Sequence, residues 1–103
     1  MYQILKNEEK TQILDSPKAY LRFKNEEIEL VELCFEENEE IPMHKNPLKV
    51  VFYVIEGEGV LKIGDSINNL SAGDIIEIHP DEDRSWKNPH KENLKVLVTK
   101  FLE

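Results

Sequence analysis

The chain has 103 residues, 40% of them apolar, and a formal net charge of −8 at pH 7 from 21 acidic and 13 basic side chains. Its length fits one domain and its apolar content is enough for a core, so a disordered chain is excluded. An acidic surface repels phosphate backbones and anionic headgroups, and no apolar run approaches the roughly 18 residues that span a bilayer, so we expect neither nucleic acid nor a membrane as a partner.

The first 27 residues carry the weakest pattern in the chain. Residues 1–10 are polar and show no secretory leader, and the single cysteine, Cys34, cannot form an intrachain disulfide. Both observations favour a cytoplasmic protein. Residues 11–14 fit an edge strand better than a helix. We interpret residues 1–27 as edge strands attached to a domain formed by residues 28–103.

From residue 28 onward the sequence predicts short strands that are separated by turns. The apolar run 49–55 is apolar on both faces, as expected for a strand buried between two layers. The glycines that follow it do not form a dinucleotide-binding loop, because no helix comes after them. The expected strands are 28–35, 49–55, 60–63, 75–78, 84–87 and 94–101. Strands of this length with frequent turns predict an all-β sandwich or barrel.

Two stretches, VVFYVIEGEGVLKIG (50–64) and LSAGDIIEIHP (70–80), resemble parts of the small single-domain cupins. The resemblance covers residues 28–101, and the spacer 58–72 is similar in length to the short spacers of bacterial cupins. It implies an antiparallel double-stranded β-helix, a jelly-roll barrel closed around an apolar interior. We also expect a homodimer, because pairing adds burial to a small domain and Tyr53 lies on the strand face away from the barrel.

The first cupin motif resembles G-x5-H-x-H-x3-E-x6-G. On this chain its five positions fall on Asn38, His44, Asn46, Val50 and Gly57. Asn38 is suited to the left-handed turn that the first glycine makes. Where the resemblance implies metal ligands, only His44 keeps a strong donor, since Asn46 is a weak neutral ligand and Val50 has none.

The second motif resembles G-x5-P-x-G-x2-H-x3-N. Its positions fall on Gly73, His79, Asp81, Arg84 and Asn88. If Pro80 is instead the proline of the motif, Ser85 stands at the histidine position and Arg84 turns outward, where it would pair with a neighbouring acidic residue. We favour the alignment that turns Arg84 inward.

A divalent transition metal needs three or four N, O or S donors at about 2.0–2.3 Å, and a fixed arginine cation repels it. No cofactor is therefore expected, and a metal bound through His44 with other ligands is kept as an alternative. His79 and His90 would have to join His44 to rebuild a three-histidine site, but most histidines in such loops are solvated.

These observations predict a pocket for a small polar or anionic molecule. Arg84 would pair with the anion, because a buried guanidinium needs a partner and its fork matches a carboxylate or phosphate. His44 and Asn46 would hydrogen-bond the ligand. The floor of the pocket would be formed by Val50, Phe52 and Trp86, although Trp86 is equally suited to core packing.

Two other functions remain open. One is a metal-dependent oxygenase or isomerase that uses His44 with non-standard ligands, and stoichiometric metal would favour it. The other is a dimeric sensor or interaction module, which a barrel filled by side chains with no space beside His44 would favour.

Overall fold

The computed structural model describes residues 1–102, so Glu103, the last residue of the predicted domain, lies outside the described residues. The described chain contains ten strands and no helix, and therefore no helix that could cross a membrane. The strands are β1 (Thr11–Asp15), β2 (Lys18–Lys24), β3 (Ile28–Phe35), β4 (Glu40–His44), β5 (Lys49–Glu56), β6 (Glu58–Ile63), β7 (Ser66–Ser71), β8 (Ile75–Ile78), β9 (Arg84–Lys87) and β10 (Leu94–Phe101).

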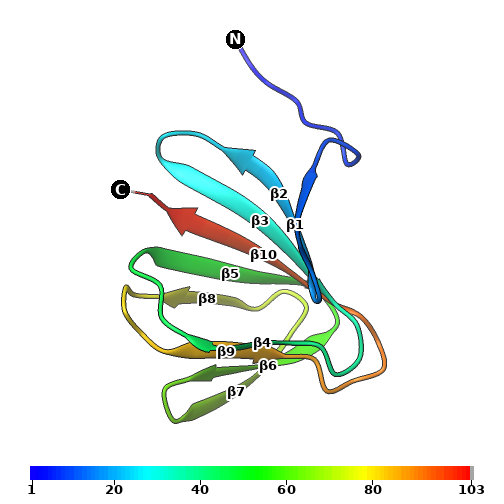
Figure 1. Ribbon diagram of the computed structural model, residues 1–103, viewed down its shortest axis with the longest axis vertical. Coiled ribbons are helices and arrows are strands. Elements are labelled where there is room, and N and C mark those ends of the chain that lie inside the picture. The colour runs from blue at the N-terminus through cyan, green and yellow to red at the C-terminus, as the bar shows by residue number, and fades with distance from the viewer. Residues whose placement is uncertain (103) are drawn as a thin grey trace.

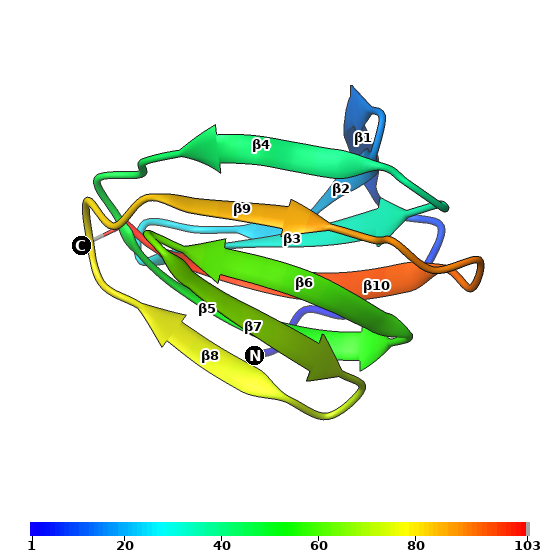
Figure 2. The ribbon, with the colours of Figure 1, turned by 90° about the horizontal axis from the view of Figure 1, so that it is seen from below.

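The strands form two antiparallel sheets. The six-stranded sheet has the order β1-β2-β3-β10-β5-β8, and the four-stranded sheet has the order β4-β9-β6-β7. Seen from below, the four-stranded sheet lies across one face of the six-stranded sheet (Figure 2). The predicted all-β, antiparallel class is confirmed by these two layers.

The core lies between the sheets because strand residues alternate between the two faces. The inward positions of three neighbouring strands are apolar and buried, namely Val31, Leu33 and Phe35 of β3, Leu94, Val96 and Val98 of β10, and Val50, Phe52 and Val54 of β5. From the four-stranded sheet, Leu61 and Trp86 pack against them. The Trp86 ring meets the Phe52 ring edge to face, with 5.4 Å between centroids.

Three strands, β2, β4 and β7, are absent from the sequence-based list. Two of them, β4 and β7, are the edges of the four-stranded sheet and are mostly exposed. An edge strand takes its register from backbone hydrogen bonds to one neighbour, so it needs no alternating apolar pattern. In the six-stranded sheet β1 lies at the edge with β2 beside it, and the residues before β1 run outward from the sheets (Figure 1).

Candidate functional site

A cavity of about 110 Å³ lies between the two sheets. Its walls include all six residues that the sequence analysis named as ligand-binding, which are His44, Asn46, Val50, Phe52, Arg84 and Trp86. The sequence analysis missed Val31, Leu33, Ile41, Val98 and Lys100, which also line it. The space beside His44 is therefore open, and the barrel is not filled by side chains at this point.

Strand pairing brings the two halves of the site together. In the register of β4 against β9, His44 lies opposite Arg84 and Ile41 lies opposite Trp86. The site thus combines residues that are about forty positions apart in the sequence, because antiparallel pairing joins segments that are distant along the chain.

Backbone conformation supports one of the two alignments of the second motif. Asp81, which stands at the glycine of that motif when Arg84 stands at the histidine, has a φ of +66°. Asn38, at the first glycine of the first motif, also has a φ of +66°. Asn and Asp are the non-glycine residues that accept this conformation most readily. In agreement, Arg84 is buried, whereas Ser85 is only half-buried.

Arg84 is a buried cation without a protein partner. It is 2% exposed, and its Nε and Nη1 atoms are buried with no hydrogen-bond acceptor among the described residues. Burial lowers the pKa of the Arg84 guanidinium below its ordinary value. That value is so high that the group stays charged. The ion pair with a neighbouring acidic residue, the alternative role for Arg84, is not formed in this part of the structure.

One more residue that lines the cavity, Trp86, has a buried hydrogen-bond donor without a partner in the described part of the chain. Trp86 Nε1 is buried and has no acceptor within residues 1–102. Each of the three unpaired nitrogens, two on Arg84 and one on Trp86, carries an N–H group. A bound molecule that accepts hydrogen bonds would satisfy them, whereas a cation would not.

The side chains of His44 and Asn46 each use one polar atom in a hydrogen bond to the backbone. His44 Nδ1 lies 2.9 Å from the carbonyl oxygen of Pro42, so Nδ1 carries the proton and Nε2 remains an acceptor in the neutral ring. Asn46 Oδ1 accepts the backbone N–H of Leu48 at 2.9 Å. The two residues therefore offer the ligand an imidazole nitrogen and an amide NH₂ group.

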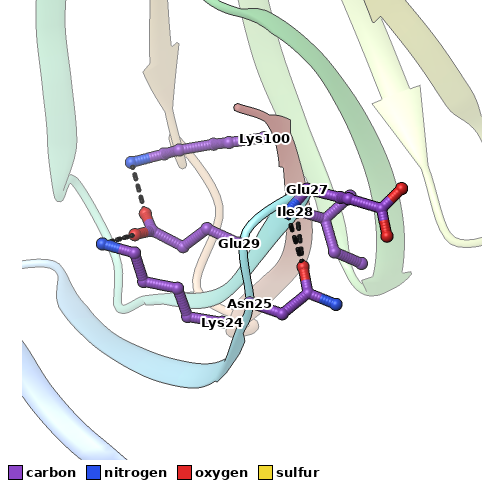
Figure 3. Close-up of polar contacts among 6 residues, drawn as sticks. All are labelled: Lys24, Asn25, Glu27, Ile28, Glu29 and Lys100. Atoms are coloured by element: carbon purple, nitrogen blue, oxygen red, sulfur yellow. Dashed lines mark hydrogen bonds and ion pairs between the residues drawn. The ribbon is translucent and has the colours of Figure 1, made fainter. Parts of the chain in front are cut away.

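Lys100 is the charged lining residue that the sequence analysis missed. Its Nζ lies 3.3 Å from Oε2 of Glu29, which also contacts Lys24 (Figure 3). A signal was present in the sequence, since the inward series Leu94, Val96 and Val98 places Lys100 on the same face of β10. Because a lysine at a strand end is more often solvated, the sequence did not lead us to assign Lys100 to the cavity.

Neither the residues at the metal positions of the motifs nor the two other histidines, His79 and His90, form a site that fits a divalent transition metal. His79 is exposed beside Glu77 at 3.5 Å, and His90 is exposed in the loop before β10. Across the described residues no three His, Cys, Asp or Glu side chains gather in a way that could hold a metal ion. Buried Arg84, at a ligand position of the motif, would also repel the ion.

Two antiparallel sheets around a central cavity, with left-handed turns at the motif positions, define a jelly-roll barrel. The sequence matches the Cupin domain family over residues 31–100, so the chain belongs to the cupin family. No curated protein matches it. The family match confirms the prediction of a small single-domain cupin.

Solved structures with the same fold support this assignment. An RmlC-like cupin from Shewanella frigidimarina NCIMB 400 is 22% identical, with a TM-score of 0.87 over 100% of this chain and 93% of that one. The polyketide cyclase RemF from Streptomyces resistomycificus is 18% identical, with a TM-score of 0.87 over 100% and 81%. A predicted oxalate decarboxylase from Thermotoga maritima is 16% identical, with a TM-score of 0.84 over 98% and 100%. At these identities the similarity shows the fold alone.

Proposed function

We propose that this cupin binds a small anionic molecule in the cavity between its sheets and that Arg84 is its anion-binding group. The observation that carries the proposal is the buried Arg84 guanidinium, which has no acceptor among the described residues. A buried charge without a counter-charge is costly, so a site that keeps one is suited to an anion that arrives from solvent.

The remaining walls suit a compact ligand. Trp86 Nε1 would donate a second hydrogen bond, while His44 and Asn46 would contact polar groups near the solvent side. Val50 and Phe52 would pack against carbon atoms. The cavity, at about 110 Å³, is smaller than the ~150 Å³ cavity that takes up benzene in a well-studied protein core. The ligand would therefore be a molecule of a few carbon atoms.

Binding can be followed through Trp86, because it is the only tryptophan of the chain and lines the cavity. We expect acetate, succinate or inorganic phosphate, titrated at constant ionic strength, to change its fluorescence with saturation. Arg84→Met should weaken binding by roughly tenfold or more, since a hydrogen-bonded charge pair contributes at least about 1.5 kcal/mol.

The matched control for this titration is Arg22→Met, because Arg22 and Arg84 are the only arginines of the chain. Arg22 does not line this cavity and contacts Glu32 at 4.0 Å. Its removal changes the net charge equally and should leave the affinity unchanged. Equal weakening in both variants, or no saturable signal in the wild type, would contradict the proposal.

A metal-dependent oxygenase or isomerase using His44 is the alternative that the donor set disfavours. We expect protein purified without a histidine tag to contain far less than one transition-metal ion per chain. Inductively coupled plasma mass spectrometry measures this content. The His44→Ala variant should give the same value. A stoichiometric metal that is lost in His44→Ala would instead establish the enzyme alternative.

We also propose that the chain acts as a homodimer, as expected of a cytoplasmic cupin of this size. Tyr53 lies across from Ile75 on β8 and from Leu97 on β10, which makes an apolar row on the outer face of the six-stranded sheet. Tyr53 and Ile75 are exposed. These three residues are uncharged, and Glu32 on β3, the next position of the row beyond Leu97, contacts Arg22 at 4.0 Å. Two copies could therefore meet along the row about a two-fold axis.

A further inference from the structure

Three charged side chains form a cluster where the inner face of the six-stranded sheet ends. Glu29 on β3 contacts Lys100 on β10 through Oε2 at 3.3 Å and Lys24 on β2 through Oε1 at 3.6 Å. Figure 3 shows Glu29 between the two ammonium groups. We call these three residues the lysine–glutamate cluster.

The surrounding turn holds this cluster in place. Asn25 Oδ1 accepts the backbone N–H groups of Glu27 and Ile28 at 2.8 and 2.9 Å (Figure 3). The Leu102 N–H donates to the Glu27 carbonyl at 2.9 Å, which ties the end of β10 to the same turn. Lys24, Glu29 and Lys100 therefore extend from a well-connected segment.

The cluster carries one net positive charge, because a single carboxylate faces two ammonium groups. The side chains of Glu29 and Lys100 are 18% and 29% exposed, so water screens their charges only in part. Lys100 also lines the Arg84 cavity. The cavity therefore has a second cationic group, Lys100, which shares the carboxylate of Glu29 with Lys24.

Arg84 and Lys100 approach the cavity from different layers. Arg84 comes from β9 of the four-stranded sheet, and Lys100 comes from β10 of the six-stranded sheet. Apolar side chains lie beside Lys100, since Val98 precedes it on the inner face and Val50 is its partner on β5. The cavity therefore has one cationic residue from each sheet, and most of its other lining residues are apolar.

We infer that the ligand is a small dicarboxylate, with one carboxylate on Arg84 and the other on Lys100. This inference rests on the proposed function, because it presupposes an anion at Arg84. A dicarboxylate carries its two charges at opposite ends of a short carbon chain, which suits a mostly apolar cavity with one cationic residue from each of two facing sheets. A phosphate concentrates its charge at one point and would use one cation well. Glu29 would act as the competitor that the second carboxylate replaces at Lys100.

The test compares acids of matched length by Trp86 fluorescence at constant ionic strength and pH 7.5. Malonate, succinate and glutarate are titrated against propionate, butyrate and valerate, and against inorganic phosphate. In the wild type we expect at least one dicarboxylate to bind roughly tenfold more tightly than the monocarboxylate of equal length. Lys100→Met should abolish this preference, because it weakens dicarboxylate binding more than monocarboxylate binding.

Lys24→Met is the matched control, since it removes the same charge from the same carboxylate at a side chain that does not line the cavity. It should keep the dicarboxylate preference. Glu29→Gln should increase the preference, because Lys100 is then released from its competitor. Circular dichroism of each variant establishes that it is folded.

Several results would overturn the inference. These are equal affinities for mono- and dicarboxylates in the wild type, an equal loss of preference in Lys24→Met and Lys100→Met, and tighter binding of phosphate than of any dicarboxylate. Each leaves the proposed function intact as long as one of these anions still binds through Arg84. Failure of every anion to bind would instead remove the proposed function itself.

Discussion

A guanidinium that is buried without a partner costs the folded state free energy, because it has left water and gained no counter-charge. Arg84→Met keeps much of the side-chain length and removes the charge. Without added anion, we expect this variant to be more stable than the wild type by about 1–3 kcal/mol. Urea denaturation followed by circular dichroism measures the difference.

The same experiment separates binding from packing. A saturating anion should stabilise the wild type, because it binds only the folded chain, and should stabilise Arg84→Met less, because the variant binds the anion more weakly. Arg22→Met should gain the same stability from the anion as the wild type does, because Arg22 does not line this cavity. If Arg84→Met were less stable than the wild type without anion, Arg84 would stabilise the folded state, and a role as an unpaired anion-binding group would be contradicted.

At the scale of one element, the bend between β5 and β6 depends on Gly57. Its φ is +81°, and a Cβ atom built there would lie against the backbone carbonyl of Asn93. Gly64 also has a positive φ, +56°, but no atom lies within 4 Å of its Cβ position. The two glycines therefore differ in their surroundings more than in their backbone strain.

This contrast gives a paired prediction. Gly64→Ala should cost about 1–2 kcal/mol, the penalty of a left-handed alanine. Gly57→Ala should cost about 3 kcal/mol or more, because the strand ends must also move apart. The free energies of unfolding of the two variants, measured under one set of conditions, should differ clearly. Equal costs would mean that the backbone near Asn93 yields easily.

The element scale also explains which strands could be predicted. β3, β5 and β10 lie in the interior of the six-stranded sheet, and apolar, β-rich runs mark them along the chain. β5 is apolar on both faces, whereas β3 and β10 have buried residues at every second position, on their inward face. By contrast, β4 and β7 are edges with few buried side chains, so their sequences resemble loops. Their strand conformation comes from pairing with β9 and β6.

For the whole molecule, the proposed homodimer can be tested with two matched isoleucines. Ile75 on β8 is 65% exposed and lies in the apolar row on the outer face, whereas Ile67 on β7 is 64% exposed and belongs to the other sheet. We expect the wild type to have about twice the chain mass of 12.1 kDa in light scattering after gel filtration.

Ile75→Glu should shift the mass toward a single chain, because it would place two like charges in the contact. Ile67→Glu adds the same charge elsewhere and should leave the dimer intact. A monomeric wild type would contradict the dimer. Dissociation by Ile67→Glu alone would place the contact on the four-stranded sheet.

The linear pattern of this chain was enough to indicate the cupin fold and to select six of the residues that line the cavity. Alternation tells which face of a strand a side chain occupies, and two motifs with characteristic spacing placed His44, Asn46, Val50, Arg84 and Trp86 on the interior. Asn38 and Asp81, in place of glycines, adopt the left-handed turns that make this alignment work.

The pairing of strands and the packing of the two sheets settled the rest. No local pattern could show that Arg84 lacks an acceptor within residues 1–102, because that depends on every segment that surrounds it. Likewise, Lys100 and Arg84 share a cavity only because β10 and β9 belong to different layers that face each other. Alternation is a property of one strand, whereas a missing partner or a shared cavity is a property of several strands brought together by folding.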